Sequence, residues 1–314
     1  MAELPKIEVK INILGDYVQI LRTRLVYKFG YPVWPVDSIE DDYSLILAYF
    51  RLLRRLVSNV RRTVVKAKSF VCPPKYVDIL AKIERKIRSG ENINAYLSRK
   101  LIRIDYNDPL MNDWGIQHLH LGERVITEGE HKGFIQGTPE LLYVYFDKQS
   151  AYFVAILDHR SFSKQYLIQT MHDNWPHVLE PYRDPNIISV YPRNPTSEEL
   201  HKLRKANLNF GIVTVSDGTT YVLIGGGVAT SGDNIMDVRR TNHLHRWAHH
   251  QTNTIKKQIP EIIVGLRTRG LEIVEPIVLR LSIENEAEKK WSLIDHNNRF
   301  HIPIAGPWVM TKRE

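Results

Sequence analysis

The sequence has 314 residues, of which 43% are hydrophobic and 25% charged, as in an ordinary soluble globular protein. This length is typical of about two domains, and the composition excludes extensive disorder and collagen-like repeats. No apolar run approaches the ~20 residues of a transmembrane helix, and the first residues lack the apolar core of a signal peptide. Because Cys72 is the single cysteine, no intramolecular disulfide forms, and we expect a cytoplasmic protein without a membrane partner.

Positive charge is concentrated in the first third of the chain. Residues 1–104 contain 20 lysines and arginines against 10 acidic residues, whereas residues 105–314 contain 23 against 25. A basic segment favours a polyanionic partner, because lysine and arginine neutralise phosphates and release counterions. A solvated helix surface explains the same charge without any partner. We expect a nucleic-acid partner, RNA in preference to DNA, with the ribosome or an acidic protein as alternatives.

The first domain is predicted over residues 1–73. Alternating isoleucine and valine indicate β-structure within 6–28. Apolar residues at helical spacing then predict a long basic helix over about 42–68. Its cations are candidate contacts for a phosphate backbone: Arg54, Arg55, Arg61, Arg62 and Lys66.

A second domain is predicted over residues 74–180, as helices and an antiparallel sheet. A helix over about 75–89 ends at Gly90, which suits a left-handed C-cap, and a shorter one covers 92–100. The first of these adds three candidate phosphate contacts: Lys82, Arg85 and Lys86. The remaining elements are expected as strands over 116–122, 141–147 and 151–158 and a helix over about 162–175.

The rest of the chain is predicted to form a proline-rich connection over 181–205 and a hairpin–helix–strand domain over 206–314. Asp217-Gly218 predicts a tight hairpin turn, followed by a helix over about 233–258. The final strands are expected at 271–282 and 291–303. The predicted fold class is therefore α+β, with a basic helical N-terminal region, a central antiparallel sheet domain and a second α+β domain.

The segment Ile-Gln-His-Leu-His-Leu-Gly contains the most informative motif, because His118 and His120 stand two residues apart on an expected strand and share one face. Imidazoles titrate near neutral pH, so an exposed pair can act as acid and base in phosphodiester cleavage without a cofactor. The pair can instead hold a divalent metal, with a third ligand from Asp158, His159 or His172. In the structural alternative, both rings bind backbone carbonyls.

Tyrosines on the next strand extend this hypothesis. Tyr143 and Tyr145 alternate with apolar residues and therefore share a face. If that face is the histidine face, the rings offer stacking platforms for bases beside the acid–base groups. Tyrosine also has a high intrinsic preference for β-strands, so the alternation fits a purely structural sheet as well.

Two basic helices followed by His-Leu-His-Leu-Gly, Leu-Leu-Tyr-Val-Tyr-Phe and Ala-Tyr-Phe-Val-Ala-Ile-Leu-Asp-His-Arg resemble the core of the RelE/ParE-like toxins. The similarity covers about residues 75–175. It implies ribosome-dependent mRNA cleavage or interference with gyrase, and it implies functional roles for His118, His120, Tyr145, His159 and Arg160.

The leading hypothesis is therefore a ribonuclease-type toxin or host-defence effector. His118 and His120 serve as acid and base, while Tyr145 and Arg160 stack a base and stabilise the transition state. A non-catalytic nucleic-acid-binding or complex-forming protein with structural histidines is the competing hypothesis.

Three further motifs receive structural interpretations. His172 closes a helix, where a cation suits the helix dipole. The loop Gly225-Gly-Gly lacks the lysine of a phosphate-binding loop and is interpreted as a strand exit. The later helix places Arg240 and His245 at R-x4-H spacing and His245 and His249 four residues apart. We expect a solvated polar face there, with nucleic-acid contact, a nuclease site and a metal site as alternatives.

Overall fold

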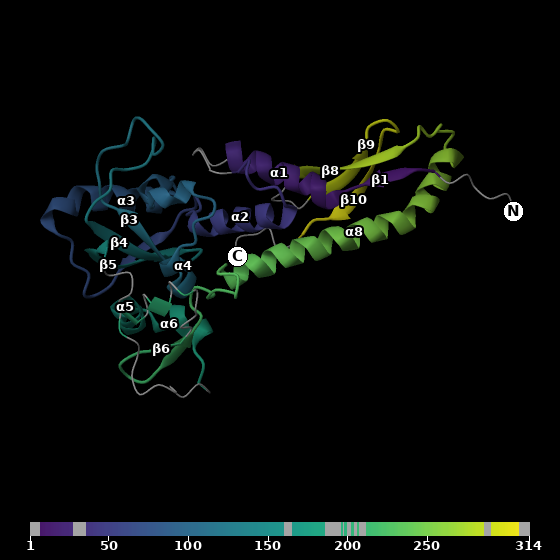
Figure 1. Ribbon diagram of the computed structural model, residues 1–314. Helices are drawn as coiled ribbons and strands as arrows, with labels where there is room; N and C mark the ends of the chain where they lie inside the picture. The colour runs from purple at the N-terminus through teal and green to yellow at the C-terminus, as the bar shows by residue number, and fades with distance from the viewer. Residues whose placement is uncertain are drawn as a thin grey trace. The chain divides into compact units, whose positions relative to one another are not determined.

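The computed structural model describes residues 7–27, 36–159, 165–185, 212–285 and 290–307, together with single positions between 196 and 206. It is an α+β structure, as predicted (Figure 1). The chain forms two compact units. The terminal unit comprises Met1–Phe29, Val36–Leu47 and Arg239–Glu314, and the central unit comprises Gly30–Pro35 and Ala48–Val238.

The domain boundaries expected near residues 73 and 206 differ from this division. The first residues join the last third of the chain, because β1 (Val9–Ile11) pairs in parallel with β8 (Ile277–Asn285). The terminal sheet has the order β1-β8-β9-β10. Its antiparallel strands β9 and β10 cover Lys290–Asp295 and Phe300–Ala305.

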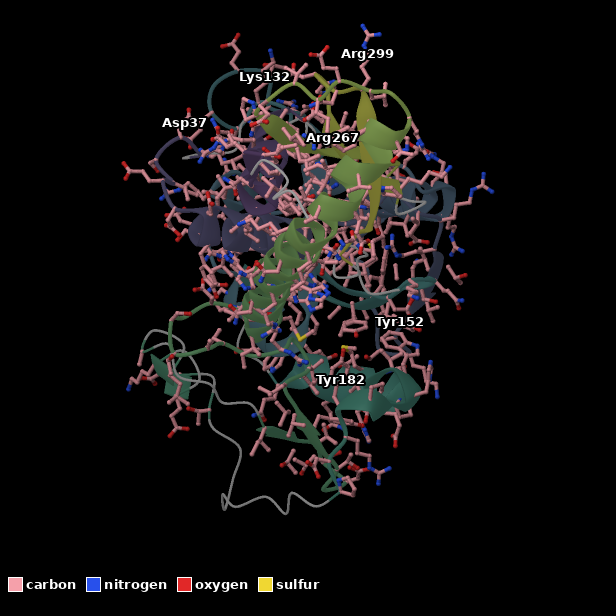
Figure 2. The ribbon with its side chains drawn as sticks, turned by 90° about the vertical axis from the view of Figure 1, so that its right-hand side faces the viewer. Asp37, Lys132, Tyr152, Tyr182, Arg267 and Arg299 are labelled. Atoms are coloured by element: carbon pink, nitrogen blue, oxygen red, sulfur yellow. The ribbon has the colours of Figure 1, made fainter. Side chains whose placement is uncertain are left out.

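The expected final strand over 291–303 is two strands, joined by a turn in which Arg299 adopts a left-handed φ of 51°. The Arg299 side chain projects outward from that turn (Figure 2). The expected strand-rich segment over 6–28 is also wrong beyond Ile11, because helix α1 covers Ile13–Tyr27. Buried apolar residues recur there at every fourth position, which is a helical stripe: Ile13, Tyr17, Leu21 and Leu25.

Helices α1 and α8 (Ile235–Thr268) pack on one face of the terminal sheet. The Tyr17 ring stacks on that of Trp291 with centroids 5.7 Å apart, and Trp247 meets Trp291 edge-on at 5.6 Å. The indole N–H of Trp247 also donates to the carbonyl of Ala305. Helix α8 continues ten residues past its predicted end, through Pro260.

The central sheet has the order β2-β5-β4-β3, with β2 parallel to β5 and the other pairs antiparallel. Three of its strands confirm the prediction to within two residues: β3 (Ile116–His120), β4 (Glu140–Phe146) and β5 (Ser150–Asp158). The predicted helix over 42–68 is wrong in its second half. Helix α2 covers Asp42–Arg55, and Thr63–Lys66 forms β2 because its β-branched residues suit a strand.

Helices and a hairpin complete the central unit. Helix α3 (Val77–Ser89) ends as predicted, with Gly90 at a φ of 78°. The helix expected over 92–100 is replaced by 3-10 turns at Asn94–Tyr96 and Arg99–Ile102. The remaining elements are α4 (Pro109–Trp114), α5 (Tyr166–Asn174), α6 (Pro176–Leu179), β6 (Ile212–Thr214) and β7 (Thr220–Val222).

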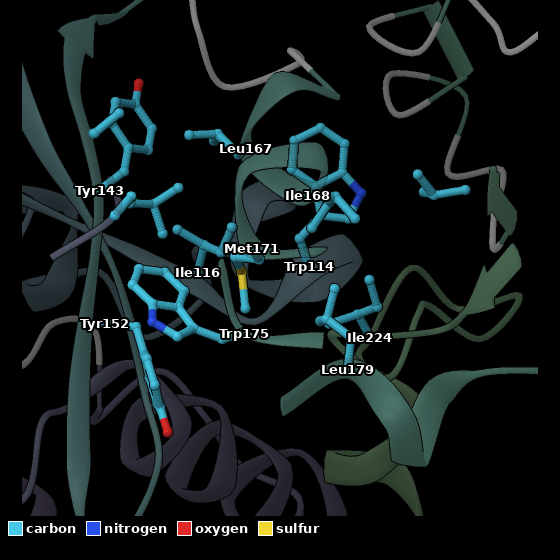
Figure 3. Close-up of a cluster of buried hydrophobic side chains, with 14 of the residues drawn as sticks. Trp114, Ile116, Tyr143, Tyr152, Leu167, Ile168, Met171, Trp175, Leu179 and Ile224 are labelled. Carbon is cyan, nitrogen blue, oxygen red and sulfur yellow. The ribbon is translucent and has the colours of Figure 1, made fainter. Parts of the chain in front are cut away.

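A large apolar cluster forms between the central sheet and α5 (Figure 3). Tyr143 and Tyr152 of the sheet meet Leu167, Met171 and Trp175. Each such side chain contributes about 1.5–3 kcal/mol by leaving water. This cluster covers the sheet face on which the predicted site lies.

No helix in the described part of the chain has both the length and the apolarity needed to cross a bilayer.

Candidate active site

The histidine strand β3 lies at the edge of the central sheet. Its register pairs His118 with Tyr143 and Ile116 with Tyr145, so the histidines and tyrosines share one face, as the hypothesis required. That face is not open to solvent, since His118 is 8% exposed, His120 6% and Tyr143 0%. The expectation of an exposed imidazole face is therefore wrong, because the apolar cluster under α5 packs on the same side.

The tyrosines belong to this packing and form no open stacking platform. Tyr145 is half-buried against the apolar cluster and lies beside Tyr152, with ring centroids 6.3 Å apart. The Tyr143 hydroxyl donates to the carbonyl of Asp158 at 3.0 Å, and burial raises the pKa of this phenol. The base-stacking role predicted for Tyr145 lacks the exposed ring face that it needs. Arg160 lies outside the described residues.

Three imidazoles nevertheless meet at one end of the sheet. The His120 ring centre lies 6.3 Å from that of His118 and 5.8 Å from that of His159. His159 directly follows β5 and is exposed, so this group reaches solvent. We call His118, His120 and His159 the histidine cluster.

Arg99 borders the histidine cluster. A Cβ atom added to Gly137 would lie 3.6 Å from the Arg99 guanidinium and 3.7 Å from the His120 ring. Gly137 therefore leaves a small space between a cation and an imidazole. Sequence reasoning did not select Arg99 as a site residue, because residues 99, 120 and 159 come from separate elements whose ends meet only after folding.

His120 is held in one protonation form. Its Nδ1 atom accepts the backbone N–H of Thr138 at 3.1 Å, so the neutral ring carries its proton on Nε2. The Thr138 hydroxyl is fixed in turn, because it accepts the Leu121 N–H and donates to the Glu140 carbonyl. Burial, with smaller contributions from the other cluster histidines and Arg99, lowers the pKa of His120 to about 4. His120 is therefore a neutral hydrogen-bond donor at neutral pH, and its lone pair is occupied.

His118 lies deeper, and burial lowers its pKa while the nearby Asp108 opposes that shift. A cavity of about 20 Å³ beside it is lined in part by Asp108, Tyr106 and Gln117. Within the described part of the chain, no group donates a hydrogen bond to the buried Gln117 Oε1. This volume suits one water molecule rather than a substrate, and a water there would satisfy the glutamine oxygen.

Two arginines predicted to bind substrate are structural. Arg55 is 5% exposed and donates to the carbonyls of Lys100 and Arg103, and burial lowers its pKa to about 10. Arg62 is 9% exposed and donates to the carbonyls of Asp147 and Ser58. Neither guanidinium is available to a phosphate backbone, because each already binds main-chain oxygens inside the central unit.

Arg54 also forms an ion pair inside the central unit. It binds Asp237 at 2.8 Å, and the two side chains are 12% and 1% exposed. The neighbouring Arg51 binds Asp233 in the same way. The basic helix thus carries a row of buried or half-buried ion pairs instead of a phosphate-binding face.

The other predicted substrate contacts remain at the surface. Arg61, Lys82 and Arg85 are exposed. Lys66 binds Glu84 at 2.6 Å and Lys86 binds Glu91 at 2.8 Å. Surface pairs of this kind are weak and exchange readily with other anions.

The glycine-rich loop packs closely against α4, in agreement with its interpretation as a strand exit. A Cβ atom on Gly225 would lie 2.4 Å from the carbonyl oxygens of Met111 and Asn112. The amide of Gly225 donates to the carbonyl of Asp113, and that of Gly227 to Asn112. These bonds fix the loop on α4 and occupy the amides that a phosphate would need.

His172 joins α5 to the β6–β7 hairpin. Its Nε2 lies 3.2 Å from Asp217 and its Nδ1 lies 2.7 Å from the Tyr221 hydroxyl. This bonding ties the hairpin down and agrees with the structural interpretation. In the terminal unit, His249 bonds to Asn253 and the His245 ring lies beside Tyr43. The described residues contain no group of three or more His, Cys, Asp or Glu side chains placed to hold a metal.

Comparison with known proteins gave no match to a protein-family model, a curated protein or a solved structure.

Proposed function

We propose that the central unit cleaves RNA at phosphodiester bonds, with the histidine cluster and Arg99 as its active site. The observation that carries the proposal is the convergence of three imidazoles and a guanidinium at one solvent-accessible end of the sheet. Imidazole and guanidinium groups together supply proton transfer and phosphate binding, which are the requirements of this reaction.

The roles in this proposal differ from those in the sequence-based hypothesis. His159 is exposed and is the general base that takes the proton of the RNA 2′-hydroxyl. His120, neutral with its proton on Nε2, donates to a non-bridging phosphate oxygen. Arg99 neutralises the phosphate. The 2′-oxygen bonds to phosphorus, the bond to the 5′-oxygen breaks, and that oxygen takes a proton from water.

The ring separation fits one phosphate. An imidazole that bonds to an oxygen at about 2.8 Å places its ring centre about 4 Å from that oxygen. Two rings 5.8 Å apart can therefore reach, one each, a non-bridging phosphate oxygen and the 2′-oxygen that attacks the same phosphorus. His118, which is buried behind them, is a positioning residue in this scheme.

The test is incubation of the full chain with labelled single-stranded RNA, duplex RNA and DNA of the same sequence, with and without ribosomes and with and without EDTA. We expect RNA products that end in a 2′,3′-cyclic phosphate, no DNA cleavage and no effect of EDTA. His159→Ala should lose at least 100-fold in rate. His177→Ala, an exposed histidine on α6, is the matched control and should retain full activity.

DNA cleavage, or full activity in His159→Ala, would contradict the proposal. Cleavage that appears only with ribosomes would support the role of a ribonuclease-type toxin or host-defence effector that the RelE/ParE resemblance implies.

A second candidate is a non-catalytic nucleic-acid-binding or complex-forming protein, because the His120–Thr138 bond is also what a structural histidine makes. In that case the exposed cations carry binding. Reversing the charge of Arg61, Lys82 and Arg85 would weaken RNA binding and flatten its salt dependence, while His159→Ala would change neither.

A further inference from the structure

Helix α8, the long green helix in Figure 1, carries a concentration of positive charge that the overall balance of residues 105–314 does not reveal. Residues 238–260 contain five lysines and arginines, four histidines and no acidic residue. The acidic residues that flank this segment are Asp237, which is 1% exposed, and Glu261. The segment is therefore a strongly basic part of a chain that is nearly neutral around it.

The polar residues of this segment form a row along one face of α8. Positions 239, 242, 246, 249, 253 and 256 follow one another in alternate steps of three and four residues, which is the spacing of a single helix face. His250 and Lys257 lie beside the row. With a rise of about 1.5 Å per residue, the row is roughly 27 Å long. We call the following exposed residues the α8 stripe: Arg239, Asn242, Arg246, His249, His250, Asn253, Lys256 and Lys257.

The opposite face of α8 is buried in the terminal unit. Leu244, Ala248 and Ile255 are 0%, 2% and 2% exposed. The Trp247 ring meets the Tyr17 ring of α1 edge-on, with ring centres 6.4 Å apart, so α1 lies beside α8. The packing fixes the helix, and the side chains of the α8 stripe face the solvent.

The cations of the α8 stripe are not neutralised by neighbours. Arg239, Arg246, Lys256 and Lys257 form no salt bridge to any residue that the structure describes. Between these cations, the His249 ring bonds to the Asn253 amide at 2.8 Å. The stripe thus offers four available positive charges, with hydrogen-bonding amides and imidazoles among them.

This composition favours a polyanion over the other possible occupants. A protein partner needs an apolar or aromatic core in the interface, but the exposed large apolar residue of α8 is Val264, which lies beyond the stripe. A membrane-bound helix inserts its apolar face, and that face of α8 packs inside the terminal unit. A second copy of the stripe would repel the first. Phosphate groups match the unpaired cations directly.

The form of the surface favours duplex RNA among the polyanions. Proteins that bind single strands stack the bases on aromatic rings, and the α8 stripe has no Phe, Tyr or Trp. An α-helix reads DNA by entering the major groove, whereas α8 is embedded to half its circumference and lies beside α1. The minor groove of duplex RNA is wide and shallow and displays 2′-hydroxyls, which side chains on such a surface can reach.

We propose that the α8 stripe is a docking surface for the sugar–phosphate backbone of duplex RNA. Arg239, Arg246, Lys256 and Lys257 bind phosphates, and Asn242 and Asn253 bond to 2′-hydroxyls. The choice of RNA over DNA rests in part on the RNA cleavage proposed for the central unit. The binding itself does not depend on that reaction, because every residue of the stripe belongs to the terminal unit.

The test is fluorescence anisotropy with a labelled RNA duplex, titrated with full-length His159→Ala so that the proposed cleavage does not consume the probe. In this background Arg246→Glu should weaken binding by roughly tenfold, and Arg246→Gln should lower the slope of log affinity against log salt by about 1. Arg299→Glu is the matched control, because Arg299 is an exposed arginine of the same unit, in the turn between β9 and β10. It should change the affinity less than about twofold.

Melting temperatures check that each variant folds, and Lys257→Glu repeats the test at another turn of the stripe if Arg246→Glu does not. Equal losses in the stripe and control variants would overturn the proposal. Equally tight binding of a DNA duplex or of single-stranded RNA would overturn the assignment to duplex RNA, and tighter binding of polyglutamate would assign the stripe to an acidic protein instead.

The two proposals fail in distinguishable ways. If the unsubstituted chain binds duplex RNA through the stripe but cleaves no RNA, only the proposed cleavage is wrong. If it cleaves RNA while Arg246→Glu and Lys257→Glu leave duplex binding unchanged, only the docking surface is wrong.

Discussion

The central and terminal sheets differ in how far their polar residues are exposed to solvent. In the central sheet both faces are covered, since adjacent residues such as Leu142 and Tyr143 are equally buried. His120 of this sheet and Arg55 at the end of α2 are desolvated, their pKa values are lowered, and they bind main-chain groups. In the terminal sheet one face stays in solvent, with His301 and Pro303 of β10 exposed there. Polar residues are therefore buried and internally bonded in the central sheet, whereas on one face of the terminal sheet they are exposed to solvent.

The sharpest way to break this comparison is Arg55→Ala. The change removes two hydrogen bonds from a charged guanidinium, to the carbonyls of Lys100 and Arg103, at about 2 kcal/mol each, so the central unit should lose about 4 kcal/mol. Hydrogen exchange of the β3–β5 amides measures this loss. Arg61→Ala, at the exposed arginine of the same region, should cost less than about 0.5 kcal/mol. Similar losses in both variants would show that Arg55 is not buried.

The pH dependence of stability gives a second test. The pKa of His120 is about 4 in the folded chain and about 6.5 in the unfolded chain, so the unfolded chain binds the proton first. Stability is complete above about pH 6.5 and falls as the pH drops toward 4, by about 3 kcal/mol from this residue. Burial lowers the pKa of His118 as well, which adds to the loss.

Urea denaturation between pH 7 and 4.5 measures this effect. His120→Asn should flatten the profile, whereas His301→Asn, on the open face of the terminal sheet, should leave it unchanged. An unaltered profile in His120→Asn would contradict the assignment of a buried, neutral imidazole.

Glycine substitutions give the smallest expected effect. Gly225→Ala places a methyl group 2.4 Å from two carbonyl oxygens and should cost about 2 kcal/mol. Gly265→Ala, in α8 of the terminal unit with no atom near its Cβ position, should instead stabilise by about 0.5–1 kcal/mol. Thermal denaturation of both variants tests whether the first change lowers stability and the second raises it. Stabilisation by Gly225→Ala would show that the glycine loop does not pack on α4.

The sequence predicted individual strands, helix ends and turns well, but it predicted contacts between residues far apart along the chain poorly. The strands around His118 and Tyr143, the end of α3 at Gly90 and the Asp217-Gly218 hairpin follow from side-chain period and turn chemistry. The fold class was also correct.

Burial was the feature that sequence could not supply. Alternation placed His118 and His120 on one face but did not show that α5 packs on the same side. Similarly, Arg54 and Arg55 read as surface charge because their partners, Asp237 and the carbonyl of Lys100, lie far away along the chain. Arg99 joined the site only through the fold.

The pairing of β1 with β8 also has a consequence for biosynthesis. Val9 precedes the central unit in the chain, whereas its neighbour Ile277 emerges from the ribosome after the whole central unit has been made. During translation the edge of β1 therefore has no cognate strand, while the central unit already has every residue that it needs to fold. The order of synthesis thus separates the two units in time: the sheet that encloses its charges is completed first, and the sheet that displays them is closed last.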